Sequence, residues 1–163
     1  MDLGDYLQLV HDRFSDDSFQ LVQDIISDIE VTIATMQEFR LSWLASKMHY
    51  FGVYGLYEEI TQPVIERFSL DSFEYAKHNY TGLPRGFQKG FASLSMLASL
   101  NVSLEAKNWV EKYSKKHFAA FELPVIVDLS KSEIIYRKKK PLWGRMYYNT
   151  FHHFIEKYYA PRN

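Results

Sequence analysis

The segment DSFQLVQDIISDIEVTIATMQEFR, residues 17–40, decides the fold that the sequence predicts. Its apolar residues recur every three or four positions, which is the spacing that places side chains on one face of an α-helix. They are Val22, Ile25, Ile26, Ile29, Ile33, Met36 and Phe39. The acidic residues Asp24, Asp28 and Glu30 fall between them. We therefore expect a helix over about 17–40 that buries one face and exposes an acidic one.

Helical spacing recurs on both sides of this segment. It predicts helices over residues 3–14, 63–68, 70–79, 87–97, 104–117 and 147–158, and an aromatic helical face within 49–57. Two short β-branched runs, 124–129 and 133–137, predict a β-hairpin instead. We therefore expect a mainly α fold: one globular domain over 1–163, built as a helical bundle with a short antiparallel β-hairpin at about 124–140.

The composition is that of a folded protein. Of 163 residues, 47% are hydrophobic and 24% charged, and a chain of this length can bury a substantial core. Cysteine is absent, which excludes disulfides, thiolate metal sites and cysteine nucleophiles. The acidic start lacks the apolar run of a signal peptide. Because the longest uncharged stretch, 90–104, is shorter than the roughly 20 residues of a membrane helix, we expect a cytoplasmic protein that does not enter a membrane.

Motifs for catalysis or metal binding do not occur in the sequence. The six histidines are scattered and form neither a His-Glu-x-x-His nor a Glu-x-x-His pair. Glu74 and His78 lie four residues apart, a spacing that more often makes a surface contact than an ion site. No serine lies in a nucleophile elbow. We expect no metal, no cofactor and no catalytic residue, and an enzyme whose site is assembled only in the fold remains an alternative.

Two small patterns have a packing interpretation and a ligand interpretation. Gly82, Gly86 and Gly90 recur every four residues, but their spacing matches neither the P-loop nor the dinucleotide fingerprint, so we expect close packing between helices there. Tyr50, Tyr54 and Tyr57 would share one helical face. They are a candidate pocket for a flat ligand, although core packing explains the same spacing.

The charge is unevenly distributed along the chain. Residues 1–30 contain eight acids against Arg13, whereas residues 101–163 contain twelve lysines and arginines against six acids. An acidic surface of Asp16, Asp17, Asp24, Asp28 and Glu30 is suited to steer a basic protein partner into place. The sequence therefore favours a non-enzymatic protein-binding protein, in its sharper form an inhibitor or immunity-type protein.

A basic aromatic segment at 137–145 favours another class of function. Its members are Arg137, Lys138, Lys139, Lys140, Trp143 and Arg145. Cations of this kind neutralise phosphates, and an aromatic ring stacks on bases. A nucleic-acid or phosphate-ligand binder is therefore the alternative.

Overall fold

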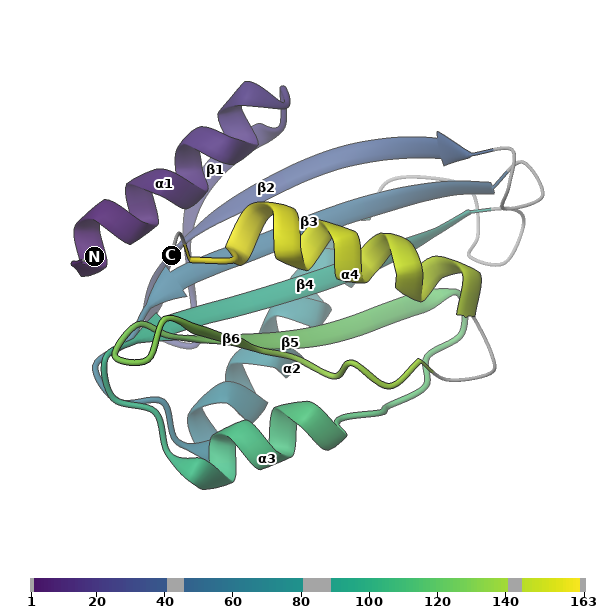
Figure 1. The fold of residues 1–163 in the computed structure, drawn as a ribbon. Helices are drawn as coiled ribbons and strands as arrows, with labels where there is room; N and C mark the ends of the chain where they lie inside the picture. The colour runs from purple at the N-terminus through teal and green to yellow at the C-terminus, as the bar shows by residue number, and fades with distance from the viewer. Residues whose placement is uncertain (1, 41–45, 81–88, 141–144, 162–163) are drawn as a thin grey trace.

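The computed structural model describes residues 2–40, 46–80, 89–140 and 145–161 (Figure 1). The helices in these ranges are α1 (Leu3–Asp16), α2 (Gln62–Asn79), α3 (Leu104–Lys112) and α4 (Arg145–Tyr159). The strands are β1 (Gln20–Ile26), β2 (Ile29–Arg40), β3 (Ser46–Leu56), β4 (Lys89–Ser99), β5 (Ala120–Asp128) and β6 (Glu133–Ile135). With 40% helix and 37% strand the fold is mixed α/β, so the prediction of a mainly α bundle is wrong.

All six strands belong to one sheet, in the order β1-β2-β3-β4-β5-β6. Strands β1, β2 and β3 are antiparallel neighbours, β3, β4 and β5 run parallel, and β6 is antiparallel to β5. Parallel neighbours require a long crossover connection. Helix α2 provides the crossover from β3 to β4, and α3 provides the one from β4 to β5.

The segment that was expected to form a helix over 17–40 forms the β1–β2 hairpin. The strands meet at Ser27 and Asp28, whose φ angles of 55° and 64° are both left-handed. Two such residues form the tight turn whose twist matches that of a β-hairpin, and Ile26 pairs with Ile29 across it. The segment is rich in β-branched residues, which pack well on a pleated sheet. The apolar residues of this segment recur every three to four positions, but they do not form one face of a helix, because the segment is a pair of strands.

The predicted helix over 87–97 is also wrong, because the described part of that range belongs to β4. Residues 90–99 are all buried, since helices cover both faces of this central strand. A strand that is buried on both sides has no polar alternation, and the spacing of Phe91, Leu94 and Leu97 then imitates a helix. The aromatic segment at 49–57 likewise belongs mostly to β3.

Gly90 lies where two strands approach closely. A Cβ atom at this position would lie 2.6 Å from the backbone carbonyl oxygen of Ala119, just before β5. Glycine is required there because any side chain would collide with the backbone. The close approach is therefore between strands, not between helices as expected, and Gly82 and Gly86 lie outside the described residues.

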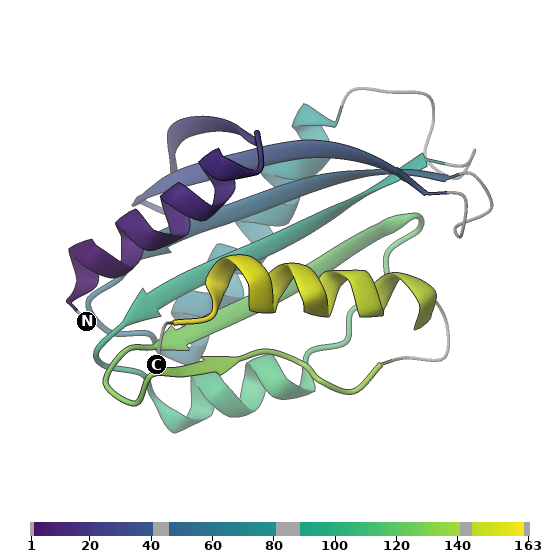
Figure 2. The ribbon, with the colours of Figure 1, turned by 45° about the horizontal axis from the view of Figure 1, so that its top comes forward.

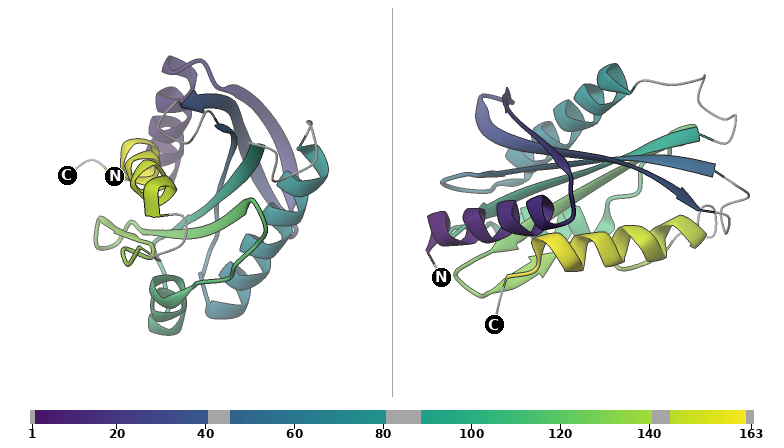
Figure 3. Two further views of the ribbon diagram at one scale, coloured as in Figure 1. Left: turned by 90° about the vertical axis from the view of Figure 1, so that its right-hand side faces the viewer. Right: turned by 90° about the horizontal axis from the view of Figure 1, so that it is seen from above.

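The helices cover the two faces of the sheet in pairs. Helices α1 and α4 lie on one face and α2 and α3 on the other, as the view along the strands shows (Figure 3, left). Under α1 and α4 the core is largely aromatic: the Phe14 ring stacks on Tyr158 at 4.4 Å and on Tyr54 at 5.3 Å. Figure 2 shows α1 and α4 crossing this face of the sheet. The high aromatic content of the sequence thus serves mainly this core.

The remaining helices and the hairpin are confirmed in place, although α3 ends at Lys112 and so is shorter than the predicted 104–117. Helix α1 covers the predicted 3–14, and α4 covers 147–158. Helix α3 begins after Ser103, whose Oγ accepts from the Ala106 N–H at 3.1 Å. Pro63 stands in the first turn of α2, which joins the two short helices predicted over 63–79. Strands β5 and β6 form the predicted antiparallel hairpin, with pairing limited to residues 126–128 and 133–135.

Candidate functional site

An acidic groove of about 600 Å³ lies beside the tip of the β1–β2 hairpin, bordered by α1 and by the end of β3. Its carboxyl groups belong to Asp24, Asp28 and Glu30, which are all exposed. Its apolar and aromatic lining comes from Leu7, Ile25, Ile29, Val31, Tyr54, Leu56 and Tyr57. Among the described residues that line this acidic groove there is no lysine or arginine. The groove therefore offers negative charge next to apolar surface.

The hairpin tip is held against α2 by polar contacts. The Ser27 Oγ donates to the Asp71 carboxylate at 2.6 Å, and this bond fixes the left-handed turn to the helix. The Arg67 guanidinium lies 3.4 Å from Asp28 and 3.5 Å from Asp71. Both Arg67 and Asp28 are well exposed, and surface pairs of this kind contribute little to stability. Asp28 therefore stays accessible to a partner.

Two apolar side chains of the groove are unusually open to solvent. Ile25 is 66% exposed and Tyr57 is 38% exposed. A tyrosine and an aliphatic residue beside carboxylates form a surface that a partner can desolvate. The helix predicted over 17–40 would bury Ile25, so that prediction is wrong for this residue. The β-branched content of 17–40 was the signal that would have placed it on an edge strand.

The floor of the acidic groove is a neutral phenol. The Tyr54 hydroxyl lies 3.4 Å from the Nδ1 atom of His11 on α1. Burial raises the pKa of Tyr54 to about 12, so the hydroxyl stays protonated at neutral pH. The negative charge of the groove therefore comes from its rim.

The five acidic candidates do not form one surface. Asp24, Asp28 and Glu30 lie together near the hairpin tip, whereas Asp16 and Asp17 lie at the other end of β1. Hydrogen bonds from Lys157 and from Tyr158 lower the pKa of Asp17 below its ordinary value. Asp17 is thus paired within the fold, and the acidic helical surface of the sequence prediction becomes the end of a hairpin.

The three tyrosine candidates separate in the same way. Tyr54 and Tyr57 line the acidic groove. Tyr50 is 2% exposed, and its ring stacks on Phe154 of α4 at 5.5 Å. On a strand Tyr50 and Tyr54 share one face, and α1 and α4 cover that face.

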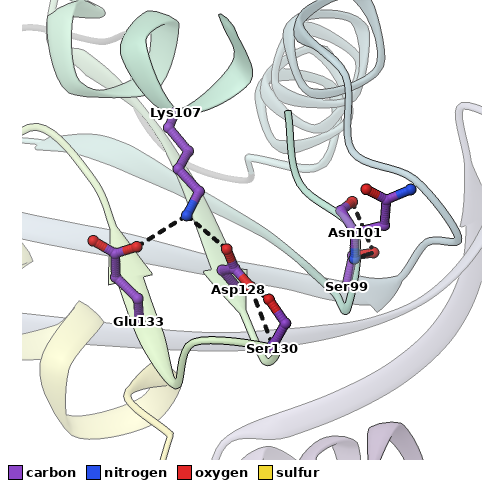
Figure 4. Close-up of polar contacts among 6 residues, drawn as sticks. All are labelled: Ser99, Asn101, Lys107, Asp128, Ser130 and Glu133. Carbon is purple, nitrogen blue, oxygen red and sulfur yellow. Dashed lines mark hydrogen bonds and ion pairs between the residues drawn. The ribbon is translucent and has the colours of Figure 1, made fainter. Parts of the chain in front are cut away.

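A polar cluster marks the ends of β4 and β5 (Figure 4). The Lys107 ammonium lies 2.6 Å from Asp128 and 2.9 Å from Glu133, and Asp128 also accepts from the Ser130 hydroxyl at 2.6 Å. Burial acts to raise the pKa of Asp128, but hydrogen bonds from Lys107 and Ser130 outweigh it and lower the pKa. Beside it, the Ser99 hydroxyl donates to the carbonyl oxygen of Glu58. These contacts close the β5–β6 turn, and we assign the cluster a structural role.

A second buried carboxylate, Glu122, lies inside β5. It accepts from the Ser69 hydroxyl at 3.0 Å and lies 2.8 Å from the His117 Nε2 atom. His117 stacks on Phe73 with ring centres 4.0 Å apart. Because the carboxylate stands between the serine and the histidine, it separates the two groups that a nucleophile–base pair would need in contact. The cluster is not a hydrolytic triad.

The basic candidates follow β6. Arg137, Lys138, Lys139 and Lys140 lie in the connection after that strand, and Arg145 is the exposed first residue of α4. Trp143 lies outside the described residues. Lys138, Lys139 and Lys140 are exposed, and Arg137 is half-buried.

Metal ligands do not cluster in the part of the chain that the structure describes: no group of three or more His, Asp or Glu side chains there could hold an ion. The Glu74 carboxylate pairs with Lys77 at 3.0 Å, while the His78 Nδ1 atom lies 2.7 Å from the Glu74 carbonyl oxygen. This pair makes local helix contacts.

None of the described helices is both long and apolar enough to cross a membrane. Comparison of the chain with protein-family models, with curated proteins and with solved structures gives no match.

Proposed function

We propose that this protein binds a basic protein partner through the acidic groove. The observation behind the proposal is the composition of the groove: three exposed carboxylates, exposed Ile25 and Tyr57, and no cation among the described lining residues. Lysine and arginine side chains of a partner would pair with the carboxylates, while their aliphatic parts and neighbouring residues cover the apolar lining.

The sharper form of the proposal is an inhibitor. A groove that accepts several cationic side chains is suited to cover the positively charged active site of an enzyme such as a nuclease, and opposite charges accelerate such an association. In this form the protein catalyses no reaction. It inhibits the partner enzyme by covering its active site.

The test compares two charge-matched variants. Asp24→Lys with Glu30→Lys changes the groove, and Asp16→Lys with Glu66→Lys changes exposed carboxylates elsewhere by the same total charge. Asp28 is left unchanged because it forms part of the turn and pairs with Arg67. Cross-linking in lysate first identifies proteins that the wild type and the control variant capture and the groove variant loses.

Association of the purified partner is then followed by biolayer interferometry at low and high ionic strength. We expect the groove variant to lower the association rate by about tenfold or more at low salt, because steering depends on charge. The control variant should change the rate by less than about threefold. Equal effects of the two variants, or a captured partner with an acidic contact surface, would contradict the proposal.

A further inference from the structure

A second charged surface forms where two distant parts of the chain meet. The Arg137 Nη1 atom donates to the Tyr113 carbonyl oxygen at 2.9 Å, and its Nε atom donates to the Lys139 carbonyl oxygen at 2.9 Å. The bond to Tyr113 joins the connection after β6 to the connection between α3 and β5, and the bond to Lys139 holds the Arg137 side chain within its own connection. Figures 1 and 2 show the two connections running close together past the end of α3.

Cations dominate both connections. We call residues 111–116 and 137–140 the basic surface. It contains seven cations, of which the six lysines are exposed, against one acid, Glu111: they are Lys112, Lys115, Lys116, Arg137, Lys138, Lys139 and Lys140. Both bonds of Arg137 go to neutral backbone carbonyls, and Lys140 donates to the neutral amide oxygen of Asn149. The fold therefore concentrates positive charge here, and no carboxylate of the described residues pairs with these two side chains.

An aromatic groove adjoins the basic surface. The ring of Trp109 lies 4.6 Å from that of Tyr113, and both line a groove of about 380 Å³ on the exposed side of α3. Gln62, Asn108 and Lys112 also line this groove, together with Glu105. Amide side chains form hydrogen bonds with base edges, and an indole ring provides a face on which a base stacks.

We propose that the basic surface and the aromatic groove together bind single-stranded nucleic acid. The lysines would neutralise successive phosphates, and an unpaired base would enter the groove against Trp109. A duplex keeps its bases stacked inside, so it could use the cations but not the groove. The basic surface lies at the start of β5 and the acidic groove at the hairpin tip beside the end of β3, so the two charged surfaces lie at opposite ends of the sheet.

The test measures fluorescence anisotropy of labelled oligothymidine and oligouridine of about 16 nucleotides, within the range that one single-strand binding module covers. Lys115→Glu with Lys116→Glu, and separately Lys138→Glu with Lys139→Glu, remove charge from the two connections. Lys77→Glu with Lys131→Glu changes exposed lysines elsewhere by the same amount. Circular dichroism must first show that each variant retains the wild-type fold.

We expect each basic-surface variant to weaken binding at least tenfold at physiological salt and to reduce the slope of log K against log salt by about 1.4, or roughly 0.7 for each lost phosphate contact. The Lys77/Lys131 control should bind within about twofold of the wild type. Binding should also quench tryptophan fluorescence, and Trp109→Phe should remove most of that quenching while retaining an aromatic ring.

Several results would overturn the proposal. They are the absence of oligonucleotide binding by the wild type, equal loss in the control variant, equal affinity for duplex and single strand, and quenching that persists in Trp109→Phe. Binding of the wild type to vesicles of phosphatidylserine, with no binding to either oligonucleotide, would assign the basic surface to lipid instead.

Discussion

The Ser27 hydroxyl of the hairpin turn donates to the Asp71 carboxylate of α2 at 2.6 Å. These residues are 44 positions apart in sequence. Their bond joins the acidic edge of the sheet to α2, which packs on one face of the sheet while α1 packs on the other (Figure 3). The turn that presents the acidic groove is thus fixed by a contact that lies outside the groove.

Ser27→Ala should therefore loosen the hairpin tip. We expect a loss of about 0.5–1.5 kcal/mol in the free energy of unfolding, because one partly buried hydrogen bond is removed and the left-handed φ of residue 27 is no longer secured. Urea denaturation measures the loss, and amide exchange should be faster at residues 24–30. Ser15→Ala, at an exposed position on α1, is the control and should change neither. Unchanged exchange in Ser27→Ala would show that the turn does not depend on this bond.

Gly90→Ala should be strongly destabilising, although it adds only a methyl group. The new Cβ would lie 2.6 Å from the Ala119 carbonyl oxygen, so either β4 or the start of β5 must move. We expect a loss of about 1–3 kcal/mol, measured by urea denaturation. At Gly4 in α1 a Cβ would have its nearest neighbour at 3.5 Å, and alanine favours a helix. Gly4→Ala should therefore be neutral or stabilising, and equal losses at both glycines would contradict the close approach.

Stability should fall between about pH 7.5 and pH 5.5 because of His152. Burial, and then the charge of Lys140, lower its pKa below the ordinary value of 6.5. Its Nε2 atom has no hydrogen-bond partner among the described residues, and its ring packs against Tyr136 and Tyr148. Below pH 6.5 the unfolded chain therefore takes up a proton that the folded protein resists, so acid favours unfolding.

The free energy of unfolding should decline by no more than about 1.4 kcal/mol for each pH unit, because this is the maximum slope when one proton is taken up on unfolding. Urea denaturation across this pH range measures the decline, and His152→Gln should flatten the curve of stability against pH. The acids Asp17 and Asp128 have lowered pKa values, so their contributions to stability are lost only below about pH 5 and do not act in this window. A His152→Gln curve that parallels the wild type would refute the assignment.

The sequence predicts the terminal parts of the fold better than its centre. Residues 3–14 and 147–158 lie on helices that cover the sheet from one side, so their patterns are those of amphipathic helices. Ser103 caps α3 by a local hydrogen bond, which is visible in sequence. By contrast, β4 is buried on both faces by contacts with distant segments, and its pattern cannot be told from that of a buried helix by spacing alone.

The turn at Ser27-Asp28 is the feature that the prediction from sequence misses, and missing it gives the wrong fold for residues 17–40. Ser27-Asp28 is a less typical two-residue turn than Asn-Gly, and the fold holds it through Asp71 and Arg67, which are far away in sequence. Once the turn is missed, Asp24, Asp28 and Glu30 are still recognised as an acidic group, but Tyr57 and Ile25 are not recognised as their neighbours. The charge of the site could therefore be predicted from sequence, and its shape could not.

Alanine substitutions in the hairpin distinguish the sheet from the helix that the sequence favours. A helix would bury Val22, Ile26 and Ile33 on one face, so all three substitutions would be costly. In the sheet Ile33 is 1% exposed and Ile26 is 5% exposed, whereas Val22 lies on the edge strand and is 54% exposed. Ile33→Ala and Ile26→Ala should each lose about 2–5 kcal/mol, because each leaves a cavity in the core beneath α2.

Val22→Ala should lose less than about 1 kcal/mol, because it removes only an exposed side chain with a modest preference for strands. Urea denaturation of the three variants under one set of conditions gives the comparison, and the slope of the transition should be the same in all of them if each unfolds from the same structure. A Val22→Ala loss as large as that of Ile33→Ala would place Val22 in a core. That result would return residues 17–40 to the helix and remove the hairpin on which the acidic groove is built.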